Sequence, residues 1–204
     1  DDDIALDVIG DVEPNSICGS GLIDIVAVLL DLGLVDDTGR FVEEGQLPAN
    51  LSDKIKKRIV EKDGEPAFVM AWNKDNSFDP VYFTQKDIRE TQLSKGAIRA
   101  GIKLLQKKMG IDDEQIEQVL LAGAFGNYIR RKSAWRIGLL PNVDRQKINY
   151  VGNAASSGAQ MILLSSKCRE AAEKLIENIT YLEIAHELEF QMVFAECLMF
   201  EHLE

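Results

Sequence analysis

The chain is built around the sequence Val119-Leu120-Leu121-Ala122-Gly123-Ala124-Phe125-Gly126-Asn127. Its first four residues are apolar or small and predict a short buried strand. Gly123 and Gly126 follow, and glycine can adopt the positive φ angles that a sharp turn requires. A strand that runs into such a turn is a common place for the phosphate or ribose of a nucleotide. A tight turn packed beneath a helix gives the same short pattern, so both interpretations stay open.

A second strand is expected to end in the same way. Residues 148–151 predict a strand that runs into Gly152 and a series of small residues ending at Ala159. The two junctions lie about 30 residues apart, which is the length of one strand-helix unit. If both strands belong to one sheet, the two turns open onto a common edge, where α/β sheets bind ligands. The pair therefore predicts a site more strongly than either turn alone.

Strands and helices alternate along the whole chain, which predicts the α/β class. Further strands are expected at residues 4–12, 67–71, 81–83 and 180–184. Helices are expected at residues 22–32, 112–118, 133–137, 160–164, 169–178 and 189–200. We interpret residues 36–83 as a smaller inserted subdomain, because their composition is more polar than that of the flanking segments. A domain rarely opens within a strand, so we expect residues 1–204 to be one lobe of a longer protein.

The longest helix is expected at residues 85–109. Thr84 is a natural N-cap, an acidic residue three positions later suits the first turn, and Gly110 ends the helix. Apolar and small residues recur near helical spacing and predict its buried face: Ile88, Leu93, Ala97, Ile98, Gly101, Leu104 and Leu105. Gly96 lies mid-helix at a cost of about 1 kcal/mol relative to alanine, which favours close packing there.

Composition excludes several functional classes. The net charge of −11 argues against a nucleic-acid partner, and no apolar run reaches the roughly 18 residues that span a bilayer. Cys18, Cys168 and Cys197 match no zinc or cluster spacing and predict reduced, mostly buried thiols. Two histidines, His186 and His202, are too few for a metal site or a triad. We expect a protein of the reducing cytoplasm that uses neither membrane nor nucleic acid.

The bend Cys18-Gly19-Ser20-Gly21 has a structural interpretation as the start of a helix, with Ser20 as its N-cap. We favour that interpretation over a ligand-binding role. No Walker, Gly-x-Ser-x-Gly or His-Glu-x-x-His motif occurs in the sequence. No catalytic residue follows from chemistry alone.

Five motifs in one order carry a resemblance to a known family. They are Ile17-Cys18-Gly19-Ser20-Gly21-Leu22-Ile23-Asp24, Phe83-Thr84-Gln85-Lys86-Asp87-Ile88-Arg89-Glu90, Leu121-Ala122-Gly123-Ala124-Phe125-Gly126-Asn127-Tyr128, Ile137-Gly138-Leu139-Leu140-Pro141 and Val151-Gly152-Asn153-Ala154-Ala155. This set resembles the C-terminal part of the reductive activators of corrinoid proteins, which are iron–sulfur ATPases of the actin and sugar-kinase superfamily. The resemblance covers nearly the whole chain.

The resemblance implies a fold and a function. The fold is an actin-like (actin and sugar-kinase-like), ribonuclease H-like α/β lobe with a mixed sheet flanked by helices. In that family, ATP-driven electron transfer returns the cobalt(II) corrinoid of a methyl-transfer protein to cobalt(I). The adenosine motif is then expected at Gly123, Ala124, Phe125 and Gly126, and the second connecting segment at residues 152–159. Lys95 and Asn153 are expected beside the nucleotide.

The resemblance also implies what these 204 residues share with other parts of a full-length protein. The iron–sulfur cluster belongs to an N-terminal domain, and ATP with Mg²⁺ is held jointly with the two phosphate-binding hairpins of an N-terminal half. The partner is a corrinoid protein, and the full-length form is expected to be a homodimer. We therefore expect this chain by itself neither to hydrolyse ATP nor to reduce a corrinoid.

Two other functions remain open at this point. The chain can be a docking module for a corrinoid protein or a sister subunit, without a nucleotide role. It can also be a lobe of another ATPase of the superfamily, such as a dehydratase activator or a small-molecule kinase.

Overall fold

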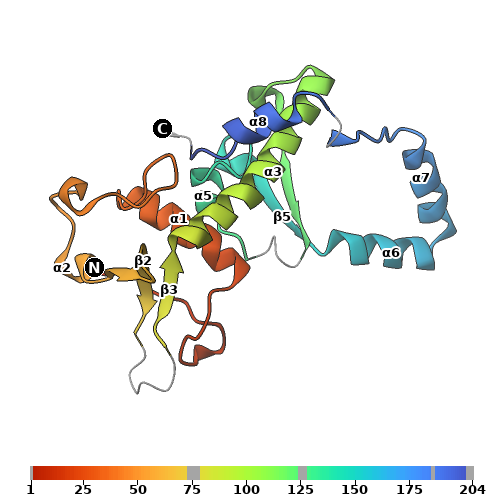
Figure 1. Cartoon of the computed structure of the whole chain (residues 1–204). Helices are drawn as coiled ribbons and strands as arrows, with labels where there is room; N and C mark the ends of the chain where they lie inside the picture. The colour runs from red at the N-terminus through yellow and green to blue at the C-terminus, as the bar shows by residue number, and fades with distance from the viewer. Residues whose placement is uncertain (1, 73–78, 124–127, 185–186, 201–204) are drawn as a thin grey trace.

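The computed structural model describes residues 2–72, 79–123, 128–184 and 187–200, and within those ranges its strands form two sheets. One sheet is antiparallel, in the order β1 (Ile59–Lys62), β2 (Glu65–Ala71) and β3 (Val81–Thr84). The other is a parallel pair, β4 (Val119–Ala122) and β5 (Ile148–Gly152). Helices connect the two sheets and pack against them (Figure 1), as the α/β class requires.

Most expected helices are present with adjusted bounds, but the helix expected at residues 112–118 is only a 3-10 turn, and α2 was not among the expected helices. The described α-helices are α1 (Gly19–Asp31), α2 (Asp53–Lys56), α3 (Gln85–Met109), α5 (Arg131–Arg136), α6 (Ala154–Leu164), α7 (Ser166–Ile176) and α8 (Phe190–Glu196). Short 3-10 turns occur at Ile9–Asp11, Glu44–Gln46, Asp113–Gln115 and Arg145–Lys147. None of the described helices is long and apolar enough to cross a membrane.

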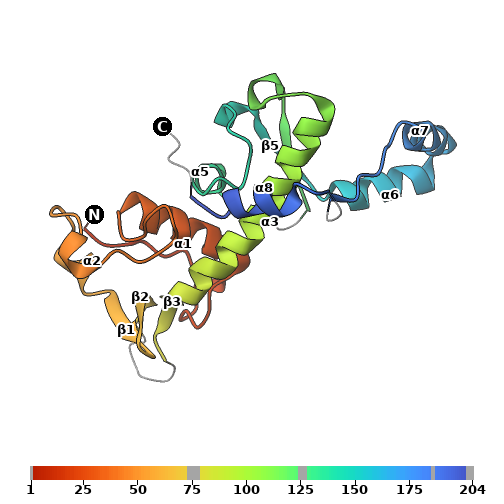
Figure 2. The same cartoon turned by 45° about the horizontal axis from the view of Figure 1, so that its top comes forward.

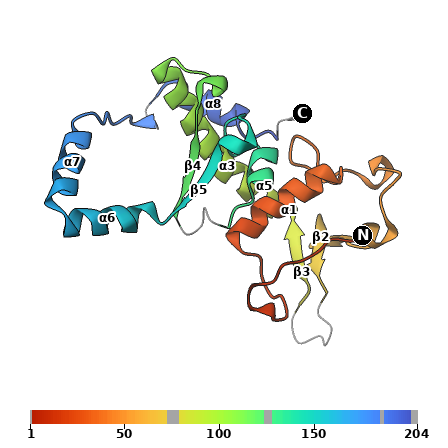
Figure 3. The ribbon, with the colours of Figure 1, turned by 180° about the vertical axis from the view of Figure 1, so that it is seen from behind.

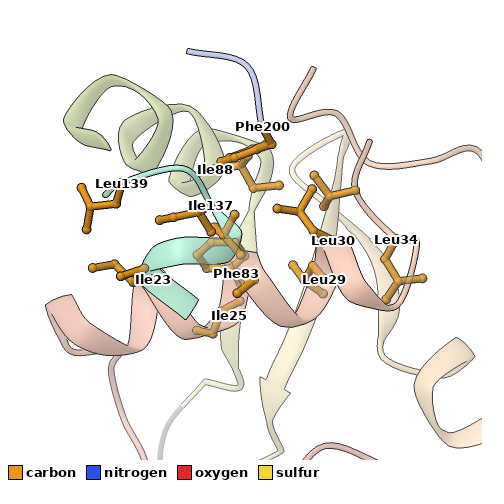
Figure 4. Close-up of a cluster of buried hydrophobic side chains, with 14 of the residues drawn as sticks. Ile23, Ile25, Leu29, Leu30, Leu34, Phe83, Ile88, Ile137, Leu139 and Phe200 are labelled. Atoms are coloured by element: carbon orange, nitrogen blue, oxygen red, sulfur yellow. The ribbon is translucent and has the colours of Figure 1, made fainter. Parts of the chain in front are cut away.

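The core is a hydrophobic cluster centred on α1 (Figure 4). Leu29 of α1 packs with Phe83 of β3, Ile137 after α5 and Phe200 near the C-terminus, all of them almost fully buried. The cluster thus joins segments that lie far apart in sequence. Leu51 and Phe68 also belong to it, so the region of residues 36–83 contributes to the main core. Its interpretation as an insertion stays a prediction.

Helix α3 begins and ends where its sequence predicts. Thr84 accepts a hydrogen bond from the Asp87 amide, and the Asp87 carboxylate accepts one from the Thr84 amide, which completes a capping box. Gly110 adopts the left-handed conformation, with φ of 66°, and ends the helix.

The buried face of α3 differs from the expected one. Leu93, Ile98 and Leu105 are about half exposed, whereas Gln92 and Lys95 are almost fully buried. Helix α8 and the segment that follows it lie along this polar face (Figure 2) and supply backbone carbonyl groups as acceptors. The apolar periodicity was therefore right at Ile88 and Leu104, which are buried, and wrong at the three exposed positions, because polar side chains can be buried where acceptors meet them.

Two expected strands are not formed. Residues 4–12 contain no strand, since Gly10 and Asp11 have φ angles of 80° and 52° that break an extended conformation. Residues 180–184 pair with no strand among the described residues. The expected cap at the start of α1 is also wrong, because Cys18 occupies the N-cap and makes no side-chain capping bond.

Helices α6 and α7 form an arm that extends away from the rest of the chain (Figures 1 and 3). The two helices contact each other, and neither contains a buried residue. Leu163, Leu164, Leu175 and Ile176 all have more than half of their surface exposed. The arm therefore carries an apolar surface that the described residues do not cover.

Candidate functional site

The two glycine turns lie at the same end of the parallel sheet. Strands β4 and β5 pair directly, with Leu121 opposite Tyr150 and Ala122 opposite Gly152. Because the strands are parallel, Gly123 and Gly152 both leave the sheet at its carboxyl edge. The prediction that the two strands are neighbours in one sheet and end at a shared edge is confirmed.

Both glycines have backbone conformations that other residues rarely adopt. The φ angle is 90° at Gly123 and 67° at Gly152, and a Cβ added to either would meet no heavy atom of the described residues within 4 Å. Packing thus does not require glycine here, whereas the left-handed conformation does. Within the part of the chain that the structure describes, nothing fills the space that a side chain would take at either glycine. Ala124, Phe125 and Gly126, also expected in the site, lie outside the described residues.

Asn153 follows Gly152 and caps α6. Its side-chain oxygen accepts a hydrogen bond of 3.1 Å from the amide of Ser156. The first turn of α6 therefore opens at the same edge of the sheet as the two glycines, with its small residues exposed. Helix N-termini favour anionic groups, because their free amide groups point outward.

Lys95 lies against the C-terminal segment, and its expected place beside a nucleotide stays a prediction. Its amine donates to the carbonyl of Met199 and sits 5.2 Å from the ring centre of Phe200. Gln92, one turn earlier, donates to the carbonyl groups of Thr38, at 3.1 Å, and Leu198, at 2.9 Å. In this arrangement Lys95 holds the C-terminal segment against α3.

Two residues that the sequence did not single out, Tyr150 and Arg131, hold the segment that leads into α5 against β5. The Tyr150 hydroxyl donates to the carbonyl of Ile129, and the guanidinium of Arg131 lies 4.9 Å from the centre of the Tyr150 ring. Tyrosine in a strand is common, so no sequence signal distinguishes this one. Its contacts set the path of the segment that leads from the edge to α5.

The Cys18 bend lies beside a cavity of about 310 Å³ between residues 4–18, α1 and the antiparallel sheet. A hydrogen bond with the Ser20 hydroxyl lowers the pKa of the Cys18 thiol. A Cβ at Gly21 would meet the Cys18 sulfur at 3.3 Å, so glycine permits close packing at this turn. The cysteines are free thiols as expected, but Cys197 alone of the three is buried.

The described residues do not supply a metal or cluster site. No group of three or more His, Cys, Asp or Glu side chains among them could hold a metal ion. An iron–sulfur cluster needs several cysteine thiolates close together, and Cys18, Cys168 and Cys197 are not so placed. The sheet edge can instead present backbone amide groups and a helix N-terminus to an anionic or sugar-bearing ligand.

Comparison with known proteins identifies the family of this chain. The model of the C-terminal domain of RACo, the ASKHA domain, matches residues 1–204. The chain is 34% identical, over 199 residues, to the corrinoid activation enzyme RamQ of Eubacterium limosum, covering 97% of this chain and 33% of that protein. It is 27% identical, over 93 residues, to the [Co(II) methylated amine-specific corrinoid protein] reductase of Methanosarcina barkeri, covering 46% of this chain and 17% of that protein.

Among solved structures, the chain resembles a reductive activator for corrinoid, iron–sulfur protein. The TM-score is 0.78 at 34% identity, and the match covers 96% of this chain and 30% of that one. The chain thus spans about a third of the length of RamQ and of this structure. The actin-like fold predicted from the motifs is confirmed. The chain belongs to the family of RACo C-terminal domains, which have the ASKHA fold.

Proposed function

We propose that this chain is the nucleotide-side lobe of an ATP-dependent reductive activator. The full-length protein would return the cobalt(II) corrinoid of a methyl-transfer protein to cobalt(I), with that corrinoid protein as its partner. The names of its relatives support corrinoid activation as the reaction class. The observation that carries the nucleotide role is the shared sheet edge, where Gly123 and Gly152 leave neighbouring parallel strands with open, left-handed backbones.

The edge would contribute binding and orientation. The Gly123 backbone can come close to a ribose or phosphate, because glycine has no side chain and no heavy atom of the described residues lies within 4 Å of the place that its Cβ would take. Asn153 keeps the first turn of α6 in place, so its free amides face the same edge. The rest of the full-length protein would hold the terminal phosphates and Mg²⁺. Holding them in place provides most of the catalysis in phosphoryl transfer.

Electron delivery is likewise assigned outside this chain. The described residues hold no cluster-forming set of cysteines, so the electron would come from a redox centre elsewhere in the full-length protein. We expect the isolated chain to show no magnesium-dependent release of phosphate from ATP. Phosphate release by the chain alone, measured at steady state, would place catalytic groups within these residues and overturn the proposed division.

The test compares two glycine variants of the full-length protein. Gly123→Val places a branched side chain at a φ of 90°, which should disrupt the turn and weaken ATP binding at least tenfold. Gly158→Ala is the matched control, because it adds a Cβ that meets no atom within 4 Å at a glycine inside α6 without positive φ. Isothermal titration with ATP and the absorbance change of a corrinoid protein provide the two measurements. Equal ATP affinity of Gly123→Val and the parent would contradict the assignment.

A docking role is the second candidate, and the α6–α7 arm favours it. The exposed apolar side chains of the arm are the kind of surface that proteins use to bind other proteins. The same titration separates the two functions. A full-length protein that binds the corrinoid protein but no ATP would support docking alone.

A further inference from the structure

Basic residues are concentrated in one short part of this acidic chain. Residues 130–147 contain six basic side chains and one acidic side chain, whereas the whole chain has a net charge of −11. The six are Arg130, Arg131, Lys132, Arg136, Arg145 and Lys147. Arg130 directly precedes α5, and the other five come from α5 and from the 3-10 turn before β5. Lys132 and Arg136 contact Asp31 at the end of α1, whereas Arg130 contacts Asp24 nearer its start.

A depression of about 680 Å³ lies within this basic region. It is lined by Lys132, Trp135 and Arg136 of α5, by Asn142 and Arg145 of the following loop and turn, and by Asp31 at the end of α1. Asp144 and Val143 complete the lining. The surface therefore combines three cations, two carboxylates and an aromatic ring.

The two carboxylates are already engaged. Asp31 accepts from the Arg136 Nε at 2.7 Å and lies 3.7 Å from the Lys132 amine. Asp144 accepts from the amide of Gln146 at 2.8 Å. One carboxylate thus serves two cations, so the positive charge of the depression is not neutralised locally.

The three cations differ in how much of their hydrogen-bonding capacity is used. The Nη1 of Arg136 is buried without a hydrogen-bond partner among the described residues. The Lys132 side chain has 72% of its surface exposed. The Arg145 guanidinium lies 5.6 Å from the ring centre of Trp135, which holds it over an aromatic face. Lys132 and Arg145, which are exposed, are therefore the two cations that a ligand can reach, whereas Arg136 is held in the wall beside Asp31.

We propose that this depression is a docking site for an acidic segment of a partner protein, one that presents carboxylates to Lys132 and Arg145 beside Trp135. Arginine and lysine around an aromatic side chain are typical of protein interfaces that recognise carboxylates. The remainder of this chain is strongly acidic and repels such a partner, so the basic patch also sets the orientation of the encounter. This surface is separate from the glycine edge and does not depend on nucleotide binding.

Two other anionic ligands fit less well. A nucleic acid would track an extended basic surface and would be repelled by the overall charge of the chain. A free phosphate is best held by a cradle of backbone amides, and α5 is only six residues long. The lining of the depression consists of side chains with long reach, which suits carboxylates carried on a flexible peptide.

The experiment uses the full-length protein and a fluorescein-labelled hexaglutamate peptide as the probe. Fluorescence anisotropy at low and high salt measures its affinity. The double variant Lys132→Gln, Arg145→Gln removes two exposed charges from the depression, and Lys167→Gln, Lys174→Gln removes two exposed charges from α7. Both double variants remove two positive charges, so their net charges are equal. The arm that carries α7 lies on the other side of the β4–β5 pair from α5 (Figure 3), so the α7 variant leaves the depression intact.

We expect the depression variant to bind the peptide about tenfold more weakly and with a smaller salt dependence, while the α7 variant binds like the parent. Circular dichroism checks that both variants are folded. Equal losses in the two variants, or no detectable peptide binding by the parent, would overturn the proposal. Displacement of the peptide by millimolar inorganic phosphate, but not by chloride of equal ionic strength, would also overturn it in favour of a small-anion site.

Discussion

Arg99 and Asp113 form an ion pair, with 2.9 Å between Nη2 and Oδ2, that ties the middle of α3 to the turn before β4. The same carboxylate accepts a 2.8 Å hydrogen bond from Gln106 and a 2.7 Å bond from the amide of Asn142. Arg99 is almost fully buried. Asp113 therefore joins three segments around the parallel sheet that forms the candidate site.

Replacing Asp113 with alanine is expected to destabilise the chain by about 3–5 kcal/mol, because it leaves the buried guanidinium of Arg99 without its counter-ion. The free energy of unfolding in urea measures the effect. Glu114→Ala is the matched control, since the Glu114 side chain is exposed and its change should cost about 0.5 kcal/mol or less. A loss below 1 kcal/mol for Asp113→Ala would show that the network is not structural.

The same network makes a prediction about pH. Burial by itself raises the pKa of Asp113, but hydrogen bonds from Arg99, Gln106 and the Asn142 amide outweigh it and hold the pKa below the usual 3.8. A depressed pKa in the folded state contributes stability that is present above the unfolded value and is lost as pH falls through the folded value. The difference in unfolding free energy between the parent and Asp113→Ala should therefore be constant above about pH 5 and shrink below pH 3.8. A difference that grows on acidification would contradict this assignment.

Phe200→Ala is expected to detach the C-terminal segment from α3. The Phe200 side chain is 1% exposed within the main hydrophobic cluster, and its amide donates to the carbonyl of Asp37 at 2.8 Å. Loss of a buried phenyl ring typically costs about 3–5 kcal/mol. Urea unfolding gives the magnitude, and faster amide exchange in α8 should accompany it. Met199→Ala serves as the control, because its side chain is partly exposed and its carbonyl still accepts from Lys95.

Substitutions in the α6–α7 arm are expected to have little effect on the free energy of unfolding. Leu163 and Leu164 are 75% and 83% exposed, so the double change to glutamine should alter the unfolding free energy of this chain by about 0.5 kcal/mol or less per site. Leu29→Ala, at a position that is 1% exposed, should cost about 2–5 kcal/mol in the same assay. Comparable losses at the two places would mean that the arm packs against the rest of the chain in solution.

Local signals in the sequence determined several elements correctly. The helix at residues 85–109 has the predicted bounds, because Thr84 and Asp87 satisfy its first amides and Gly110 takes the left-handed conformation that ends it. The strands before Gly123 and Gly152 were also predicted, together with their place side by side in one sheet. These features depend on neighbouring residues or on a single repeating unit, which is why the sequence by itself specifies them.

Tertiary structure decided what those elements contact. Gln92 and Lys95 were not part of the buried face that the apolar pattern predicted, yet they are buried and donate to the carbonyl groups of Leu198 and Met199, about 100 residues later. The charge of residues 130–147 is visible in the sequence, but only folding brings Asp31 of α1 to Lys132 and Arg136 and leaves a depression between them. Both outcomes depend on residues that are distant in the chain. A polar group can be buried only where folding brings hydrogen-bonding partners to it, and the local sequence does not determine which distant residues become those partners.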